Sequence, residues 1–473
     1  MLKMLVVTHR WLGIVLGPLF AMWFASGIVM HFVPFPHLNE SERVAGLAPL
    51  RLEGSLHGPA DAVIALGVTD ALRVRLIQRA DGPVYVVSGA LGSAALRATD
   101  LAPAGLPSDQ IALVIGADYA RQRGMTAADS ARIVLIDRDQ WTVAGQYHRH
   151  RPLYRLALDD DAGTEIYVSS KTGEVVLDTT RRERAWNFIG SVAHWIYLTP
   201  LRSKPELWSA IVWWLSLTAF VSVVAGAVLG IARLRIDGKR RRSPYQGMHW
   251  WHHVLGLFSL IFVTTWIFSG WLSMDDGRLF SNARVSATET AAVSGAPRWD
   301  RLMEENLQHI DLQTREVEWF AFDGKLFRRE ITAANAQRLA EVGSSEPQRE
   351  SLSLTTVRPI TTRLGPACGD PAKLGPMGNY AIASVMPDAP VYRITCGDVW
   401  YDIDTANGAL LLKTDSSRRT YRWLYRALHT LDFPALEARP MLRTVLIVSL
   451  CGIGLLFSLT GLVIGARRLR RGI

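Results

Sequence analysis

The chain has 473 residues, of which 49% are hydrophobic and 20% are charged. This composition excludes an intrinsically disordered chain, and three cysteines in a chain of this length exclude a small disulfide scaffold. A net charge of +9 at pH 7 can indicate a nucleic-acid partner. The positions of the basic residues along the chain decide whether it does so here.

Four uncharged apolar runs dominate the sequence, each long enough for the roughly 20 helical residues that cross a bilayer. Four buried helices of this kind would need a very large soluble protein around them, so we predict a membrane protein. The first run has no small-residue cleavage site before His31, so we expect it to be retained and not removed as a signal peptide. The predicted transmembrane helices cover residues 9–32, 207–232, 249–274 and 441–466.

The basic residues concentrate outside these runs, in residues 1–10, 233–242 and 467–471. Those segments hold twelve Lys and Arg residues and one acidic residue, Asp237. Their summed charge of +11 exceeds the net charge of +9 of the whole chain. The positive-inside rule then places both chain ends, the loop 233–248 and the tail 467–473 in the cytoplasm. Two large domains, 33–206 and 275–440, lie on the opposite side. The charge is explained by topology and contact with lipid, and no nucleic acid is implied.

The two halves of the chain are related by constant offsets. An offset of 243 residues aligns His9 with His252 and Gly27 with Gly270, and an offset of 235 aligns the later part of each half. Each half therefore reads as helix, domain, helix. Because each half crosses the membrane twice, both have the same orientation, and we predict two parallel repeats around an axis along the membrane normal. The later pairs are His194 with His429, Gly226 with Gly461, and Gly230 with Gly465.

Each outside segment has the pattern of a small α+β domain. Alternating stretches that turn at Gly173 and Gly408 predict β-hairpins. Residues 107–119 are predicted to be helical, and the polar stretch 335–350 is predicted to be a loop. The predicted fold class is thus an α-helical membrane protein with four transmembrane helices and an α+β domain in each repeat.

The three cysteines separate into a pair and a single residue. Cys368 and Cys396 lie in the second outside segment, in a compartment where disulfides persist, so we expect them to be bonded. Cys451 lies in the fourth helix and is expected to be a buried apolar residue. The sequence has no CxxC motif, so it indicates neither thiol-redox chemistry nor covalently attached haem.

Four histidines form two repeat-related pairs at the ends of the predicted helices. His9 and His252 lie at the cytoplasmic starts of helices one and three, and His194 and His429 lie just outside helices two and four. Parallel repeats put the members of each pair at one depth, where they can converge on the axis. This pattern predicts bis-histidine coordination of two haem b groups, one near each membrane face. The alternative for any single histidine is a residue that caps a helix at the membrane interface.

Other residues remain open as ligands. A bare metal site is disfavoured because no Asp, Glu or Cys accompanies either pair at ligand spacing. His252 and His253 point about 100° apart on a helix, so only one faces the axis, and the repeat selects His252. His31 has no repeat counterpart and is a substitute ligand for the outer haem. Arg184 and Arg419, each ten residues before its histidine, either pair with haem propionates or form a solvated basic surface.

Several of these motifs carry a family resemblance. The His9-Arg10-Trp11-Leu12-Gly13 start of the first helix, its echo in the third, the 172–175 Thr-Gly-Glu-Val hairpin and the Gly-x-x-x-Gly ending followed by arginines resemble the PepSY-associated transmembrane family of iron-regulated inner-membrane proteins. The similarity covers nearly the whole chain. It implies a PepSY-like periplasmic domain in each repeat and a bacterial inner membrane. Members include dihaem ferric-siderophore reductases of Gram-negative bacteria.

The favoured function is therefore an enzyme activity: a dihaem electron-transfer protein that reduces a periplasmic ferric siderophore, or another Fe(III) chelate, and releases Fe(II) for uptake. The cytoplasmic connections are too short for a flavin or nicotinamide domain, so the electron donor is expected to be quinol or a separate redox protein. One alternative is a non-enzymatic periplasmic binding or peptidase-regulating module on a membrane anchor. A transporter with a midplane site is a weaker alternative because the apolar runs lack central charges and Gly/Pro interruptions.

Overall fold

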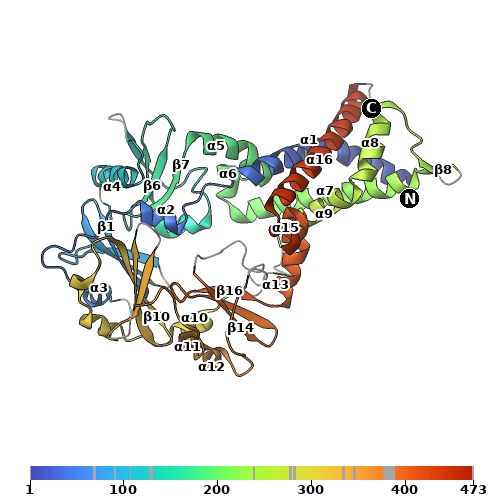
Figure 1. Ribbon diagram of the computed structural model, residues 1–473. Coiled ribbons are helices and arrows are strands. Elements are labelled where there is room, and N and C mark those ends of the chain that lie inside the picture. The colour runs from blue at the N-terminus through green and yellow to red at the C-terminus, as the bar shows by residue number, and fades with distance from the viewer. Residues whose placement is uncertain are drawn as a thin grey trace. The chain divides into compact units, whose positions relative to one another are not determined.

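The computed structural model describes two compact units, and each is treated by itself (Figure 1). The helical unit comprises Met1–Phe35, Glu183–Asn282 and Ser417–Ile473, and the sheet unit comprises Pro36–Arg182 and Ala283–Ser416. The structure describes the chain except for residues 1, 68–70, 90–91, 107, 127–130, 238–239, 276–279, 281–283, 333–335, 345–347, 376–388 and 471–473.

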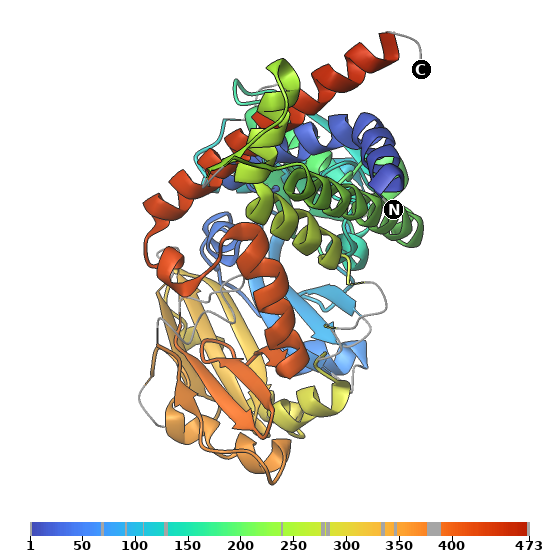
Figure 2. The same cartoon turned by 90° about the vertical axis from the view of Figure 1, so that its right-hand side faces the viewer.

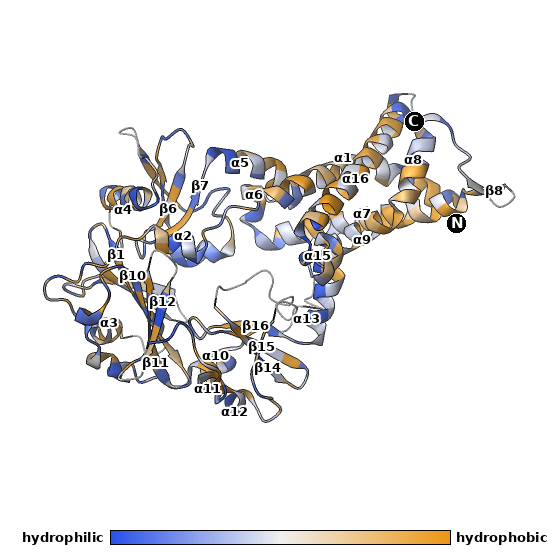
Figure 3. Ribbon diagram, viewed as in Figure 1, coloured by the Kyte–Doolittle hydropathy of each residue, from blue (hydrophilic) through white to orange (hydrophobic). Residues whose placement is uncertain are grey.

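Long apolar helices form the helical unit (Figure 3). By length and composition, α1 (Leu2–Phe32), α7 (Pro205–Ala232) and α16 (Pro440–Arg470) can each cross a membrane. The third predicted helix is present as two pieces, α8 (Gly247–Phe258) and α9 (Leu260–Leu272), which meet that criterion only when they are taken together. The described residues therefore contain three helices that are long and apolar enough to cross a membrane, or four if the bent pair is one span.

The bend between α8 and α9 departs from the single helix predicted over 249–274. The two axes differ by 70°, and Ser259 stands at the break. Its hydroxyl lies 3.5 Å from the carbonyl oxygen of Gly256, and its side chain is fully buried. A Gly and a Ser close together are a common cause of helix bends because glycine has no side chain to stiffen the turn and serine competes for backbone carbonyls. Residues 249–274 are therefore apolar throughout, but they form two helices and not one straight helix.

The core of the helical unit lies among α1, α7, α9 and α16. Helix α16 packs against α1 (Figure 2). Gly454 of α16 lies against the ring of Phe24, where a Cβ atom would lie 2.6 Å from the nearest ring carbon. Small residues at such crossings allow helices in a membrane to approach closely. Large side chains such as Val15 and Ile261 are exposed on the outside, as expected of surfaces that face lipid. The buried core residues are Leu16, Phe24, Ala219, Val263, Trp266, Ile267, Ile447 and Cys451.

Short helices join the long helices to the rest of the chain in a pattern that the 235-residue offset repeats. In the first half, α5 (Arg181–Asn187) runs into a π-helix, η2 (Phe188–Val192). In the second half, α13 (Ser416–Tyr421) runs into a π-helix, η7 (Arg422–Ala427). The remaining short elements here are α6 (Thr199–Arg202), α14 (Leu428–Thr430), α15 (Pro434–Glu437) and the β8–β9 hairpin (Arg235–Asp237, Arg240–Arg242).

Three antiparallel sheets make up most of the sheet unit. The central six-stranded sheet has the order β12-β11-β10-β1-β2-β3, and two four-stranded sheets have the orders β4-β5-β6-β7 and β13-β14-β15-β16. The strands are β1 (Ala71–Arg79), β2 (Gly82–Gly89), β3 (Gly92–Arg97), β4 (Arg132–Ile136), β5 (Leu153–Ala157), β6 (Glu165–Ser169), β7 (Val175–Thr179), β10 (Thr314–Phe322), β11 (Lys325–Thr332), β12 (Gln337–Glu341), β13 (Ala372–Lys373), β14 (Val391–Cys396), β15 (Val399–Asp404) and β16 (Leu410–Thr414). The helices are α2 (Glu40–Ala45), α3 (Pro59–Leu66), α4 (Asp109–Gln122), α10 (Ala287–Ser294), α11 (Leu354–Val357) and α12 (Ile360–Leu364).

Several predicted local elements are present. The predicted hairpins correspond to β6–β7 and β15–β16, with Gly173 and Gly408 at positive φ in the turns, a conformation that glycine adopts without strain. The helix predicted over 107–119 is α4, which begins after Ser108, whose side chain accepts from the Ile111 amide. The loop predicted over 335–350 is wrong in part, because β12 lies there and pairs with β11. Residues 107, 335 and 345–347 lie outside the described residues.

The two outside segments meet in the central sheet. Strand β1 of the first segment pairs with β10 of the second, with Val74 opposite Trp319. On one face of this seam, Val74, Leu76, Val317 and Trp319 are fully buried against α3. The segments predicted as separate domains therefore share one sheet and one hydrophobic core.

The opposite face of the same seam carries buried ion pairs. Glu316 on β10 contacts Arg43 on α2 at 2.5 Å and Arg75 on β1 at 3.4 Å, and Arg75 also contacts Glu174 at 2.7 Å. Burial alone would raise the pKa of the Glu316 carboxyl, but the two guanidinium groups outweigh burial and hold that pKa at about 2, below the usual 4.5. These charges are buried but paired, as buried charges must be.

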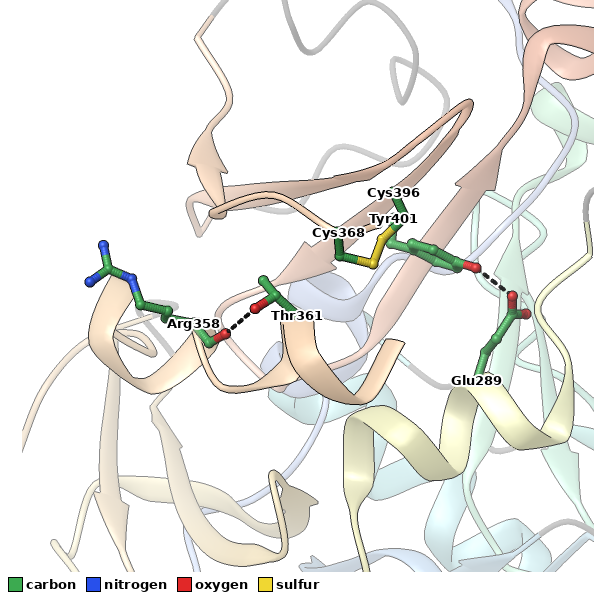
Figure 4. The surroundings of a disulfide bond; sticks show 6 residues. All are labelled: Glu289, Arg358, Thr361, Cys368, Cys396 and Tyr401. Carbon is green, nitrogen blue, oxygen red and sulfur yellow. Dashed lines mark hydrogen bonds between the residues drawn. A yellow bond between two sulfur atoms is a disulfide. The ribbon is translucent and has the colours of Figure 1, made fainter. Parts of the chain in front are cut away.

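The expected disulfide joins Cys368 to Cys396 at the end of β14 (Figure 4). Beside it, the Tyr401 hydroxyl donates a hydrogen bond of 2.6 Å to Glu289 on α10. Cys451 is the free cysteine among the described residues, and it is buried as expected. The pairing from sequence is thus confirmed, and it ties the loop after α12 to the second four-stranded sheet.

Loss of one buried charge at the seam should destabilise the sheet unit. Replacing Glu316 with Gln leaves Arg43 and Arg75 without their shared carboxylate, and we expect the free energy of unfolding of the full chain in detergent to fall by about 3 to 5 kcal/mol at pH 7. The Glu316 pKa is lowered by folding, so its contribution is present above about pH 4.5 and disappears as the pH falls toward about 2. Urea unfolding followed by circular dichroism measures both effects.

The exposed Glu53→Gln variant is the matched control and should unfold like the natural chain. Equal stability of Glu316→Gln and Glu53→Gln at pH 7 would show that the seam does not depend on this ion pair.

Candidate functional site

The structure brings His9 and His252 together in the helical unit. His9 lies on α1 and His252 on α8, and their ring centroids are 6.3 Å apart with an interplanar angle of 40°. The Nδ1 atom of His9 lies 3.0 Å from the carbonyl oxygen of Ser222 on α7. The Nδ1 atom of His252 lies 3.0 Å from the hydroxyl of Thr460 on α16. Four helices thus contribute to this site, which we call the inner pair.

His194 and His429 form a second pair in the same unit. Their ring centroids are 6.1 Å apart, with an interplanar angle of 71°. The Nδ1 atom of His194 lies 3.0 Å from the Ser26 hydroxyl on α1. The Nδ1 atom of His429 lies 3.1 Å from the Ser269 hydroxyl on α9 and 3.2 Å from the carbonyl oxygen of Trp266. We call this site the outer pair.

Each of the four imidazole rings turns its Cε1 edge toward a glycine of a neighbouring helix. A Cβ atom built on Gly226 would lie 2.5 Å from Cε1 of His9, and one on Gly461 would lie 3.2 Å from Cε1 of His252. At the outer pair the distances are 3.8 Å from Gly27 to His194 and 3.3 Å from Gly270 to His429. These glycines are the two pairs that the constant offsets relate in the sequence, and they make room for the rings.

The centroid separation in both pairs matches that of two imidazoles bound to one metal atom. An iron–nitrogen bond of about 2.0 Å and about 1.1 Å from nitrogen to ring centre, taken twice, give centroids about 6.2 Å apart. Nδ1 is engaged in all four rings, and no described residue makes a hydrogen bond to Nε2 in any of them. The Nε2 atoms, which make no hydrogen bond to the described residues, are therefore the nitrogens that could bind a metal. Within the described residues no group of three or more His, Cys, Asp or Glu side chains could hold a bare metal ion.

The outer histidines owe their positions to the π-helices that precede them. His194 follows η2 by two residues and His429 follows η7 by two, and a residue at φ of 51° comes two residues after each histidine, Ile196 in one half and Leu431 in the other. A π-helical turn inserts an extra residue and is found frequently at functional sites. The equal placement in both halves orients the two histidines alike.

Buried polar side chains that the sequence did not single out hold these turns. Asn187 at the end of α5 donates to the carbonyl oxygens of Pro34, at 3.0 Å, and Glu183, at 3.1 Å. At the equivalent position of the second half, Arg422 pairs with buried Asp432 at 3.0 Å, just after His429. The first half thus holds its turn with amide hydrogen bonds, and the second half uses an ion pair. Because the equivalent residues differ, comparing the two halves of the sequence could not reveal them.

The alternative ligands have other contacts. Both ring nitrogens of His253 are used, Nδ1 at 2.8 Å from the Ser243 hydroxyl and Nε2 at 2.8 Å from the Gly230 carbonyl oxygen. His31 turns its Nε2 to the Thr444 hydroxyl at 2.8 Å and packs its ring against Phe32. These contacts leave His253 and His31 less suited than the paired histidines to bind iron.

The two predicted propionate partners occupy equivalent places. Arg184 lies on α5 and Arg419 on α13, each half-buried and ten residues before its outer histidine. Both make interactions with other described residues, so their role toward a bound group stays a prediction.

The fold and these sites define a helical membrane protein with two half-buried histidine pairs and a separate unit of α helices and antiparallel sheets. The family model of the PepSY-associated TM region matches residues 6–468, and the chain therefore belongs to this family. Comparison with curated proteins gave no match.

The close approach of Gly226 to His9 yields a test of the inner pair. Gly226→Ala should displace the His9 ring, because the new Cβ would lie 2.5 Å from Cε1, and destabilise that site by about 1 to 3 kcal/mol. The measurement is the haem bound per chain after purification from haem-replete cells. Gly452→Ala on α16, where a Cβ meets no atom within 4 Å, is the matched control and should bind as much haem as the natural chain. Equal haem content of the two variants would contradict this role of Gly226.

Proposed function

We propose that each histidine pair holds one haem b by axial coordination, and that the protein carries electrons across the membrane to reduce an Fe(III) chelate. The observation that supports this best is the recurrence of one arrangement at two sites. Both pairs have centroids just over 6 Å apart, Nδ1 atoms in contact with oxygen, and Nε2 atoms facing no described hydrogen-bond partner. Bound haem supplies reversible one-electron chemistry.

The two proposed haem sites belong to opposite ends of one helix. Helix α1 carries His9 of the inner pair and, 17 residues later, Ser26, whose hydroxyl contacts His194 of the outer pair. A rise of 1.5 Å per residue separates these levels by about 25 Å, most of the hydrocarbon core. We further propose that the two halves are parallel repeats with both termini in the cytoplasm of a bacterial inner membrane. The inner pair then lies toward the cytoplasm and the outer pair toward the periplasm.

The residues at each site have separate tasks in this proposal. The Nε2 atoms of the paired histidines bind iron, the Nδ1 contacts fix which nitrogen carries the proton, and the glycines allow the rings to approach the neighbouring helices. Arg184 and Arg419 pair with propionates as guanidinium forks. The reaction needs no acid or base from the protein, because only an electron is transferred to the chelate.

The proposed substrate is a ferric siderophore or a similar Fe(III) chelate in the periplasm, next to a PepSY-like domain formed by the sheet unit. Reduction to Fe(II) weakens the hold of an oxygen-rich chelator, and the iron is released for uptake. Quinol or a separate redox protein supplies the electrons. Membership of the PepSY-associated family supports this proposal, together with the resemblance to dihaem ferric-siderophore reductases.

The other two candidate functions explain less. A non-enzymatic periplasmic binding or peptidase-regulating module would not need two histidine pairs within the helical unit. The bend at Ser259 removes one argument against a transporter, since a broken helix is a feature of many transporters. Residues 250–274 around the bend, however, contain no Asp, Glu, Lys or Arg, which disfavours a midplane site for a charged substrate.

Single histidine variants test the two-site proposal. His194→Ala or His429→Ala should remove the outer haem, and His9→Ala or His252→Ala the inner haem, because a haem with one axial ligand is held poorly. The haem content should fall from two to one per chain in each case. Reduction of external Fe(III) chelate by proteoliposomes containing the physiological donor should stop in all four. Absorption spectra of the oxidised and dithionite-reduced proteins identify which haem remains.

His249→Ala, at an exposed position of α8 three residues before His252, is the matched control and should keep both haems. Loss of both haems in every single variant would indicate general misfolding, and full activity of His9→Ala would contradict the two-pair assignment.

A further inference from the structure

Each outer imidazole is linked through one hydroxyl to a backbone carbonyl. His194 contacts Ser26 Oγ, which donates to the carbonyl oxygens of Met22 at 2.6 Å and Trp23 at 3.2 Å. His429 contacts Ser269 Oγ, which donates to the carbonyl oxygen of Trp266 at 3.1 Å. The 243-residue offset that relates Ser26 to Ser269 also relates Trp23 to Trp266. The two halves therefore build the same relay of ring, hydroxyl and carbonyl.

The two histidines of the inner pair are connected to equivalent backbone carbonyls in two different ways, one through a hydroxyl and one directly. His252 contacts Thr460 Oγ1, which donates to the carbonyl oxygen of Phe457 at 2.6 Å. His9 lies directly against the carbonyl oxygen of Ser222 at 3.0 Å. The 235-residue offset relates Ser222 to Phe457. Three of the four rings thus use a side-chain hydroxyl, and only His9 uses the backbone alone.

Helix structure alone does not account for these hydroxyls. A serine or threonine inside a helix often donates to a carbonyl one turn back, which slightly destabilises the helix, and alanine would suit these positions better. Ser26 and Ser269 have 1% and 0% of their surface exposed, so each also bears the cost of burying a hydroxyl. The imidazole provides a second partner for that hydroxyl, and this contact recurs at both outer ligands.

We propose that Ser26 and Ser269 are positioning residues that hold the outer histidines with Nδ1 protonated and set the reduction potential of the outer haem, and that Thr460 does the same at the inner site. This inference rests on the proposed haem sites. A hydrogen bond from Nδ1–H to oxygen makes the ring a more basic ligand, and a more basic ligand favours ferric over ferrous iron. A hydroxyl that itself donates to a carbonyl is polarised and accepts more strongly. Removing the hydroxyl should therefore raise the potential.

Redox titration of the haem-loaded full chain in detergent tests the inference, with the two haems assigned from the single histidine variants. In Ser26→Ala and in Ser269→Ala, the ratio of reduced to oxidised outer haem at a fixed potential should rise roughly threefold, and in the double variant roughly tenfold, with the inner haem unchanged. Ser26→Thr keeps a hydroxyl and should restore the natural ratio. Thr460→Val is nearly isosteric and should move the inner haem alone.

The outcomes separate this inference from the function on which it rests. A natural chain without haem would overturn the proposed function and this inference together. Two bound haems whose potentials do not move in the serine variants would overturn this inference alone. A shift of both haems by one serine variant, or the same shift in Ser26→Thr as in Ser26→Ala, would also overturn it, because packing and not the hydroxyl would then be responsible.

Discussion

A histidine ring in an apolar helix bundle has two polar nitrogens, and each of them needs a polar partner to replace lost hydration. In both pairs the Nδ1 atom is satisfied by an oxygen of another helix, whereas Nε2 faces no described hydrogen-bond partner. A polar nitrogen placed among apolar helices loses hydration, and a group bound at Nε2 would offset that loss at all four rings. In the proposed function that group is iron between the two rings of each pair, which agrees with centroid separations of 6.3 and 6.1 Å. The glycines beside the rings and the π-helices before the outer histidines all serve to place these nitrogens.

The two halves of the chain depend on each other in both units. In the helical unit each histidine pair takes one ring from each half, so neither half contains a complete site. In the sheet unit the pairing of β1 with β10 joins the outside segments, with an apolar core on one face and buried ion pairs on the other. The repeat organisation predicted from the sequence would explain why the paired histidines keep a constant spacing. Other residues diverged, as Asn187 and Arg422 show.

Residues that recur at a constant offset could be predicted from the sequence. Features that depend on contacts between distant segments could not. His9, His252, His194 and His429 could be selected because a constant offset relates them, and the disulfide because two cysteines share one outside segment. The bend at Ser259 could not be read from hydropathy, since the run is apolar on both sides of it. Strand β12 is polar and lies at a sheet edge, where backbone pairing and not side-chain pattern determines the structure. The shared sheet and the hydroxyl relays join residues more than 150 positions apart, which local patterns do not report.

The central claim is that the chain holds two haems, each between two histidines. The most direct measurement is the amount of non-covalent haem per chain in protein purified from haem-replete cells, together with absorption spectra of the oxidised and dithionite-reduced forms. The account predicts two haem b per chain with low-spin, six-coordinate spectra, as expected for two imidazole ligands. A colourless, iron-free protein that is folded under the same conditions would contradict it.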